Sequence, residues 1–113
     1  MLPKQKRLNL KYDFKWVASG KALDTKFAKL FVRLGNNQNP RVGIASSTKN
    51  FKEAHLRNKA RRVLSAAFET LYINLPTNIN IVALPKTPIL GVKSGDVLLE
   101  LEEVLKKEKI LKS

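Results

Sequence analysis

The stretch RNKARRVLSAAF, residues 57–68, joins a run of nitrogen-rich side chains to a run of apolar ones. Apolar residues recur around it at steps of three and four, which predicts one long helix over about residues 53–73. The apolar stripe of this helix consists of Leu56, Ala60, Val63, Leu64, Ala67, Phe68 and Leu71. At about 100° per residue the cations flank the stripe, so the helix should begin as a charged surface and end in a core.

The rest of the chain alternates between strand and helix patterns. In chain order it predicts a helix at Leu10–Ala18, strands at Lys26–Leu34 and Arg41–Ser47, a buried strand at Asn78–Pro85 and a closing helix at Asp96–Lys107. The turn cluster Gly35–Pro40 predicts a hairpin of the first two strands, and the crossover through the long helix predicts that the second and third are parallel. We therefore expect one α+β domain over residues 1–113, with helices packed on one face of a small sheet and the other face available.

The excess of basic over acidic side chains lies entirely in the first part of the chain. The sequence has 22 Lys and Arg against 9 Asp and Glu, and residues 1–62 hold 16 of the basic and 3 of the acidic side chains. Such asymmetry favours a polyanion-binding surface, with a merely soluble basic protein as the alternative. The absence of cysteine excludes disulfides, and no apolar run approaches the ~18 residues of a membrane span. We expect a cytoplasmic protein that binds nucleic acid, with no membrane partner and no small-molecule substrate.

Two surfaces are candidates for that binding. The first is the basic start of the long helix, which contains Arg57, Asn58, Lys59, Arg61 and Arg62. Cations there are unfavourable for the helix dipole and suit phosphate oxygens, although a solvated face is the alternative. The second is one face of the first strand, where aromatic and basic residues alternate as for single-stranded nucleic acid; if helices cover both faces, these phenylalanines are core. Its residues are Phe27, Lys29, Phe31 and Arg33.

The basic part of the chain lacks the residues that hydrolysis of a nucleic acid would require. Its acids are Asp13, Asp24 and Glu53, which are far apart in sequence, whereas metal-assisted hydrolysis needs clustered carboxylates. His55 is the single histidine and has no partners that would make a metal site. We therefore expect no catalytic residue in this chain.

Three segments together resemble the protein component of bacterial ribonuclease P. They are K-x-x-R-L-x-x-x-x-D-F at Lys4–Phe14, R-V-G-I at Arg41–Ile44 and TKNFKEAHLRNKARR at Thr48–Arg62. The resemblance covers about residues 4–107. It implies an α/β sandwich of the ribosomal protein S5 domain 2-like type, with a left-handed βαβ crossover. It also implies an accessory subunit of a ribozyme that removes the 5′ leader of precursor tRNA, with the Mg²⁺ ions bound mainly by the RNA and no organic cofactor.

The resemblance also assigns roles to residues. The motif helix residues Arg57, Asn58, Lys59, Arg61 and Arg62, with Thr48 and Lys49 before them, would bind ribonuclease P RNA. A cleft for the precursor tRNA leader would contain Phe14, Trp16, Lys29, Phe31 and Arg33. The chain departs from the family pattern at Lys59, Asn50, Ser65 and Ala18, and Trp16 would compensate for the aromatic that Ala18 replaces. The alternatives are a structural RNA-binding protein of the ribosomal type and a nonspecific DNA-binding protein.

Overall fold

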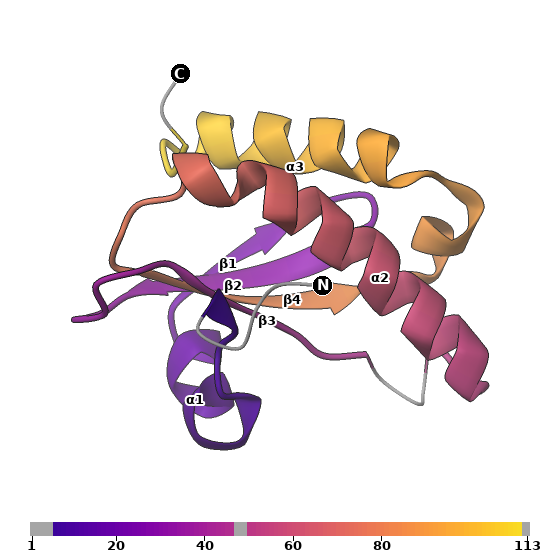
Figure 1. Ribbon diagram of the computed structural model, residues 1–113, viewed down its shortest axis with the longest axis horizontal. Coiled ribbons are helices and arrows are strands. Elements are labelled where there is room, and N and C mark those ends of the chain that lie inside the picture. The colour runs from indigo at the N-terminus through magenta and orange to yellow at the C-terminus, as the bar shows by residue number, and fades with distance from the viewer. Residues whose placement is uncertain (1–5, 47–49, 112–113) are drawn as a thin grey trace.

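The computed structural model describes residues 6–46 and 50–111 (Figure 1). Its elements are α1 (Leu10–Ala18), β1 (Lys21–Asp24), β2 (Ala28–Leu34), β3 (Arg41–Ile44), α2 (Ala54–Leu71), β4 (Ile79–Pro85), α3 (Ser94–Lys107) and the 3₁₀ helices η2 (Tyr72–Asn74) and η3 (Thr87–Gly91). The expected α+β class is confirmed. The predicted long helix and the five other predicted helices and strands are all present. Strand β1 was not expected, because only Leu23 of its four residues is buried and no alternation shows.

The four strands form one mixed sheet in the order β1-β2-β4-β3. Strand β4 pairs antiparallel with β2 and parallel with β3, so the predicted parallel pair is confirmed. The predicted hairpin is wrong, since β4 lies between β2 and β3. Every residue of β4 except Leu84 is buried, which fits a central strand flanked on both sides and on both faces.

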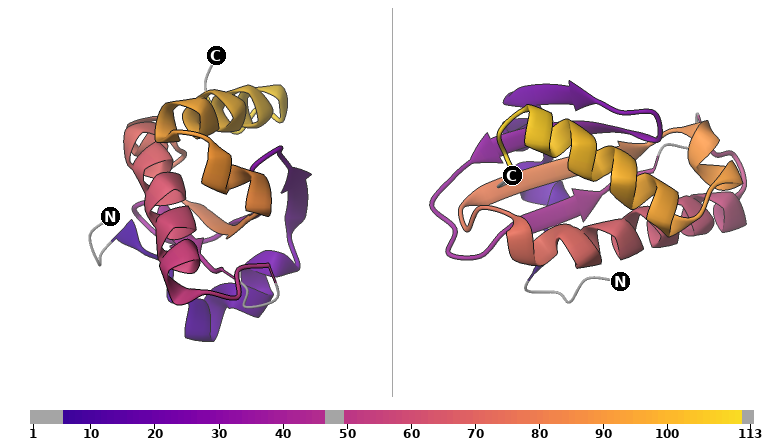
Figure 2. Two further views of the ribbon diagram at one scale, coloured as in Figure 1. Left: turned by 90° about the vertical axis from the view of Figure 1, so that its right-hand side faces the viewer. Right: turned by 90° about the horizontal axis from the view of Figure 1, so that it is seen from above.

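The helices lie on both faces of the sheet, so the expectation that all of them share one face is wrong. Helices α2 and α3 lie side by side on one face, and α1 lies on the other (Figures 1 and 2). The main core fills the space between the sheet and α2 and α3. Its largest fully buried side chains include Phe51, Leu64, Phe68, Ile81 and Leu101.

A second, smaller cluster lies under α1. Its buried members are Leu8, Val17 and Val82, with Leu10, Phe14, Phe31 and Leu84 packed against them. Gly43 allows this approach, because a Cβ at that position would lie 2.6 Å from Leu10 Cδ2. Helix α1 is therefore packed directly onto the middle of the sheet, which decides where the open parts of that face lie.

Two residues of the first predicted strand differ from the alternating pattern. Phe27 precedes β2 and packs against the main core, so it does not belong to the aromatic and basic face. The Thr25 hydroxyl accepts from the Ala28 backbone N–H at 2.9 Å and donates to the Ala28 carbonyl oxygen at 2.7 Å. Phe27 lies in this turn and not in the strand, so its side chain does not follow the alternation of β2. Leu34, the last residue of β2, is apolar but 61% exposed.

Candidate nucleic-acid interface

Arg57 anchors the loop that leads into α2. Its Nη1 donates hydrogen bonds to the carbonyl oxygens of Phe51, at 2.8 Å, and Lys52, at 3.1 Å. Phe51 is 1% exposed, so the guanidinium holds the loop at the point where the chain leaves the core. The side chain is half-buried. Arg57 thus has a structural role in addition to its positive charge.

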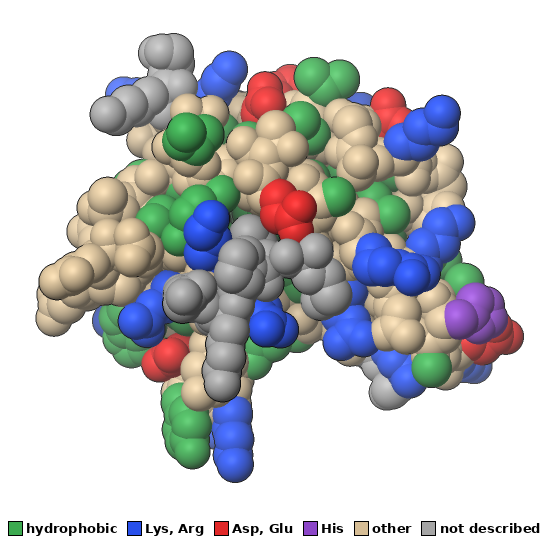
Figure 3. All heavy atoms as spheres, viewed as in Figure 1, with side chains coloured by type: hydrophobic (Ala, Val, Ile, Leu, Met, Phe, Trp, Pro, Cys, Tyr) green, Lys and Arg blue, Asp and Glu red, His purple; other side chains and the backbone are tan. Residues whose placement is uncertain are grey.

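The other motif residues present a positive surface on the first half of α2. Arg61 Nη2 donates to Asn58 Oδ1, while Arg61 Nε is buried and has no hydrogen-bond partner in the described part of the chain. Lys59 and Arg62 are exposed. Basic side chains gather over this end of the molecule, beside the single histidine (Figure 3). Ser65, in contrast, is 3% exposed and belongs to the buried side of α2.

The start of α2 has neither a capping hydrogen bond from a side chain nor an acidic residue in its first turn. Glu53 occupies the N-cap without a side-chain cap bond, and the first turn contains no acidic residue. Glu53 Oε2 instead lies 3.3 Å from His55 Nε2. The backbone amides of the first turn and the neighbouring cations together suit an anion such as a phosphate group. Thr48 and Lys49, assigned to the same surface, lie outside the described residues.

The strand pairings show which residues lie side by side, in rows across the strands, on the sheet face beneath α1. Phe31, Val82 and Gly43 are paired across β2, β4 and β3, and form the middle row. Arg33, Asn80 and Arg41 form the next row by the same pairings. Since α1 packs on the middle row, the basic residues to either side of it remain in reach of solvent.

Helix α1 separates the residues that were assigned to a single cleft. At about 100° per residue, Phe14 and Trp16 lie roughly 200° apart around the helix and therefore on opposite sides of it. Phe14 and Phe31 belong to the same small cluster, and Lys29 Nζ lies 5.3 Å from the centre of the Phe31 ring. We call these three residues the Phe14–Phe31 patch. Ala18 shares the side of Phe14, so Trp16 does not fill the place of an aromatic there.

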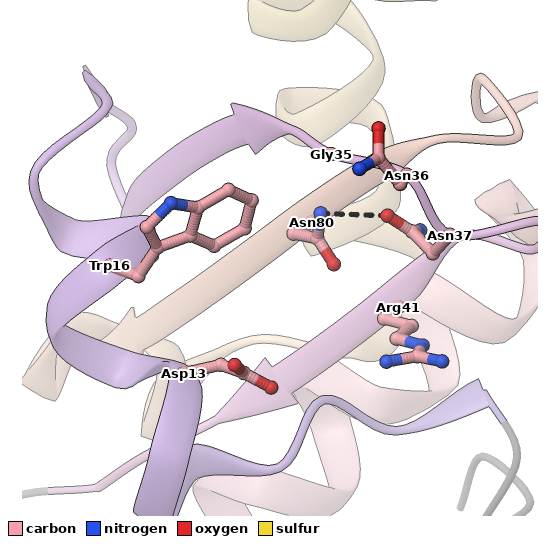
Figure 4. A pocket seen from close by; sticks show the side chains of 7 residues that line it. All are labelled: Asp13, Trp16, Gly35, Asn36, Asn37, Arg41 and Asn80. Carbon is pink, nitrogen blue, oxygen red and sulfur yellow. Dashed lines mark hydrogen bonds between the residues drawn. The ribbon is translucent and has the colours of Figure 1, made fainter.

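On the opposite side of α1, Trp16 and Arg33 are joined. Arg33 Nη1 donates to the Trp16 carbonyl oxygen at 3.1 Å and to Ser19 Oγ at 2.6 Å. Its guanidinium lies 4.8 Å from the centre of the indole ring, a cation–π contact. The Trp16 side chain borders a cavity of about 310 Å³, seen in Figure 4. Its lining residues are Asp13, Trp16, Gly35, Asn36, Asn37, Arg41 and Asn80.

Asn80 and Arg41 line this cavity and were not predicted as site residues. The available signal was the polar Asn80 within the apolar strand INIVALP, because a buried amide requires hydrogen-bond partners.

Tyr72 of η2 donates its hydroxyl to the Pro40 carbonyl oxygen at 2.8 Å. Burial raises the pKa of Tyr72, and the charge of Arg41 opposes that rise. This bond ties the segment before β3 to η2.

No set of three or more metal-ligating side chains comes together among the residues that the structure describes. In the same part of the chain, no helix is long and apolar enough to cross a membrane. The fold and these surfaces define a small basic α+β protein suited to contact a polyanion.

Comparison with known proteins identifies the family. The ribonuclease P family model matches residues 2–109. The ribonuclease P protein components of Chlamydia muridarum and Blochmanniella pennsylvanica are 35% and 31% identical, over 92% and 91% of this chain and 90% of each relative. That of Pseudoalteromonas atlantica is 33% identical over 69% of this chain and 64% of its own length. The RNase P protein from Thermotoga maritima, solved in complex with 1-(4-fluorophenyl)-2-thiourea, has a TM-score of 0.76 at 28% identity, over 88% of this chain and 97% of that one.

The chain belongs to the ribonuclease P protein family. It is a component of the ribonuclease P holoenzyme and takes part in tRNA processing. The resemblance of the sequence to the bacterial ribonuclease P protein component is confirmed, and so is the predicted α+β fold class.

Proposed function

We propose that this chain binds ribonuclease P RNA through the first half of α2 and receives the 5′ leader of precursor tRNA on the Phe14–Phe31 patch. It would thereby assist endonucleolytic removal of the leader, with catalysis carried by the RNA. The observation that carries this proposal is the positive surface of α2, where Lys59 and Arg62 are exposed near a first helical turn that contains no acidic residue. Guanidinium and ammonium groups in this setting suit the phosphates of a folded RNA.

The magnesium ions of the reaction are assigned to the RNA. Among the described residues no three His, Cys, Asp or Glu side chains come together, so none of them is proposed as a magnesium ligand. The protein's own contribution is binding: it would hold the leader in place while the RNA carries out the cleavage.

The Phe14–Phe31 patch supports the leader assignment by its chemistry. Phe14 and Phe31 are half-buried, so each ring is held in place while part of it reaches the surface. Lys29 is exposed next to Phe31. Aromatic faces that stack on bases, next to a cation that follows the phosphates, are typical of proteins that bind single strands.

Reconstitution tests the proposed function. The purified protein is mixed with a bacterial ribonuclease P RNA, and 5′ cleavage of a precursor tRNA is followed at low magnesium, with each component alone as a control. We expect cleavage only when both are present. Binding of RNA without any stimulation of cleavage, also with the cognate RNA, would move the assignment to a structural RNA-binding protein.

A paired substitution tests the leader surface. Phe31→Leu keeps an apolar side chain but removes the stacking face, and should weaken binding of a precursor tRNA with a leader about five- to tenfold. Tyr12→Leu removes an aromatic that is 73% exposed on the solvent side of α1 and should have no effect. Mature tRNA, which lacks the leader, should not distinguish Phe31→Leu from the wild type. Equal affinities of both variants for the precursor would show that this patch does not receive the leader.

A further inference from the structure

The cavity between α1 and the β2–β3 turn is separate from the Phe14–Phe31 patch. It lies on the Asp13 and Trp16 side of α1, and its floor is the row of Asn80 and Arg41 on β4 and β3 (Figure 4). Its volume of about 310 Å³ is enough for a planar heterocycle. The leader assignment does not use it.

The orientation of Asn80 is determined by its hydrogen bonds. Its Nδ2 donates to Asn37 Oδ1 at 2.9 Å and to the Arg33 carbonyl oxygen at 3.3 Å. Asn37 is fixed in turn, because its own Nδ2 donates to the carbonyl oxygens of Asn39 and Ile79 at 2.7 and 3.1 Å. Both amide hydrogens of Asn80 are thus used, and its Oδ1 points away from Asn37 into the cavity (Figure 4). Asn80 is 4% exposed, and within the described residues this oxygen accepts no hydrogen bond.

Two charged groups of the cavity are also available. Among the residues described, the Asp13 carboxylate and the Arg41 guanidinium form no ion pair or side-chain hydrogen bond, and Figure 4 shows both side chains at the cavity. The site therefore offers a carboxylate and an amide oxygen as acceptors, and a guanidinium as a donor. An amide oxygen and a carboxylate that face an open cavity can accept hydrogen bonds from a ligand that donates them.

Trp16 forms an aromatic wall. A Cβ at position 35 would lie 2.9 Å from Trp16 Cη2 and 2.9 Å from Asn80 Nδ2, so Gly35 is what allows the indole to rest against the turn. Arg33 holds the same ring through its cation–π contact. The indole is 39% exposed, which leaves surface for a ligand to stack on.

We propose that this cavity binds an unpaired guanine base of an RNA. Guanine presents two donors, N1–H and N2–H, next to the acceptor O6, which matches the Asp13 carboxylate and Asn80 Oδ1 next to the Arg41 guanidinium. Adenine would turn its N1 acceptor toward the carboxylate, and a phosphate would be repelled by it. The inference rests on the proposed function that the chain binds RNA. The base comes either from the leader or from ribonuclease P RNA.

The intrinsic fluorescence of Trp16 gives a direct measurement, because it is the single tryptophan of the chain. The first probe is a nine-nucleotide oligouridine with one central guanosine, compared with the same strand carrying inosine or adenosine. Binding is followed in parallel by anisotropy of an end label. We expect guanosine to quench Trp16 and to bind about tenfold more tightly than adenosine, with inosine between them because it lacks the N2 amine.

A second arm distinguishes the source of the base. Ribonuclease P RNA is added without leader, and quenching at this stage would assign the guanine to that RNA. Quenching that requires a guanosine in the single strand would assign it to the leader. Either result supports the pocket.

Variants test the residues. Asp13→Asn should bring the preference for guanosine over adenosine to within about twofold, and Gly35→Ala should displace the indole and reduce the quenching. Glu103→Gln, which removes an exposed carboxylate from α3 on the opposite layer, is the matched control and should behave as the wild type. If the oligonucleotides bind with no base preference and no quenching occurs in either arm, the guanine pocket is overturned while RNA binding stands. If no RNA binds at all, the proposed function fails with it.

Discussion

Replacement of Arg57 by alanine should destabilise the protein, although it removes a cation from an unfavourable position. The side chain donates to two carbonyl oxygens, at 2.8 and 3.1 Å, and bonds of this kind to a charged group contribute about 1.5–3 kcal/mol each. One of the two is exposed, so we take a loss of roughly 2 kcal/mol in total. Removing a cation near a helix start returns about 0.3–1 kcal/mol. The net loss is about 1 kcal/mol, or roughly 4 °C in Tm for a domain of this size.

Lys59→Ala is the matched comparison, because it removes the same charge from the same end of α2. Lys59 is exposed and, in the described part of the chain, donates no hydrogen bond, so its loss should leave Tm unchanged or raise it slightly. Thermal melting followed by circular dichroism measures both variants. Added salt should leave the difference between the two variants unchanged, because it screens the dipole term that both share and leaves the hydrogen bonds of Arg57. Equal Tm values for the two variants would refute the anchoring role of Arg57.

Three further outcomes are expected. Glu108→Gln should lower Tm at neutral pH and leave it unchanged in acid. The hydrogen bond and charge of Lys21, 2.6 Å away, hold the pKa of Glu108 below its ordinary value. The stability that this pair contributes is therefore present above the ordinary pKa and is lost as pH falls through the lowered pKa. Gly20→Ala should cost about 1–3 kcal/mol in urea unfolding, because its Cβ would lie 2.4 Å from the Val32 carbonyl oxygen, whereas Gly95→Ala on α3, with open space around it, should be neutral or stabilising. Single-stranded RNA affinity should fall with salt at a log–log slope of about −3 if ~4 phosphates are neutralised, and a slope near zero would exclude phosphate contacts.

Local periodicity predicted the elements of this protein better than their arrangement. The apolar stripe of α2 requires only the spacing along one helix, and the structure gives α2 as Ala54–Leu71. The position of β4 between β2 and β3 depends on contacts between segments far apart in sequence, and the turn cluster before Arg41 wrongly favoured a hairpin. For the site, the spacing of Phe14 and Trp16 on a helix already indicates opposite sides. The cavity at Asn80 could not be predicted, because it depends on the register of three strands.

The spacing along β2 explains why one helix leaves two basic edges on the same sheet face. Lys29, Phe31 and Arg33 point to one side of the strand, and Lys29 and Arg33 lie about 13 Å apart at ~3.3 Å per residue. A helix with its side chains is about 10–12 Å wide, so α1, centred on the row of Phe31 and Val82, cannot cover both cations. Both are exposed as a result. The alternation of basic, aromatic and basic residues along β2 therefore gives α1 one apolar residue to pack on and leaves a cation on each side of the helix. Lys29 lies on the side of the Phe14–Phe31 patch, and Arg33 lies on the side of the cavity.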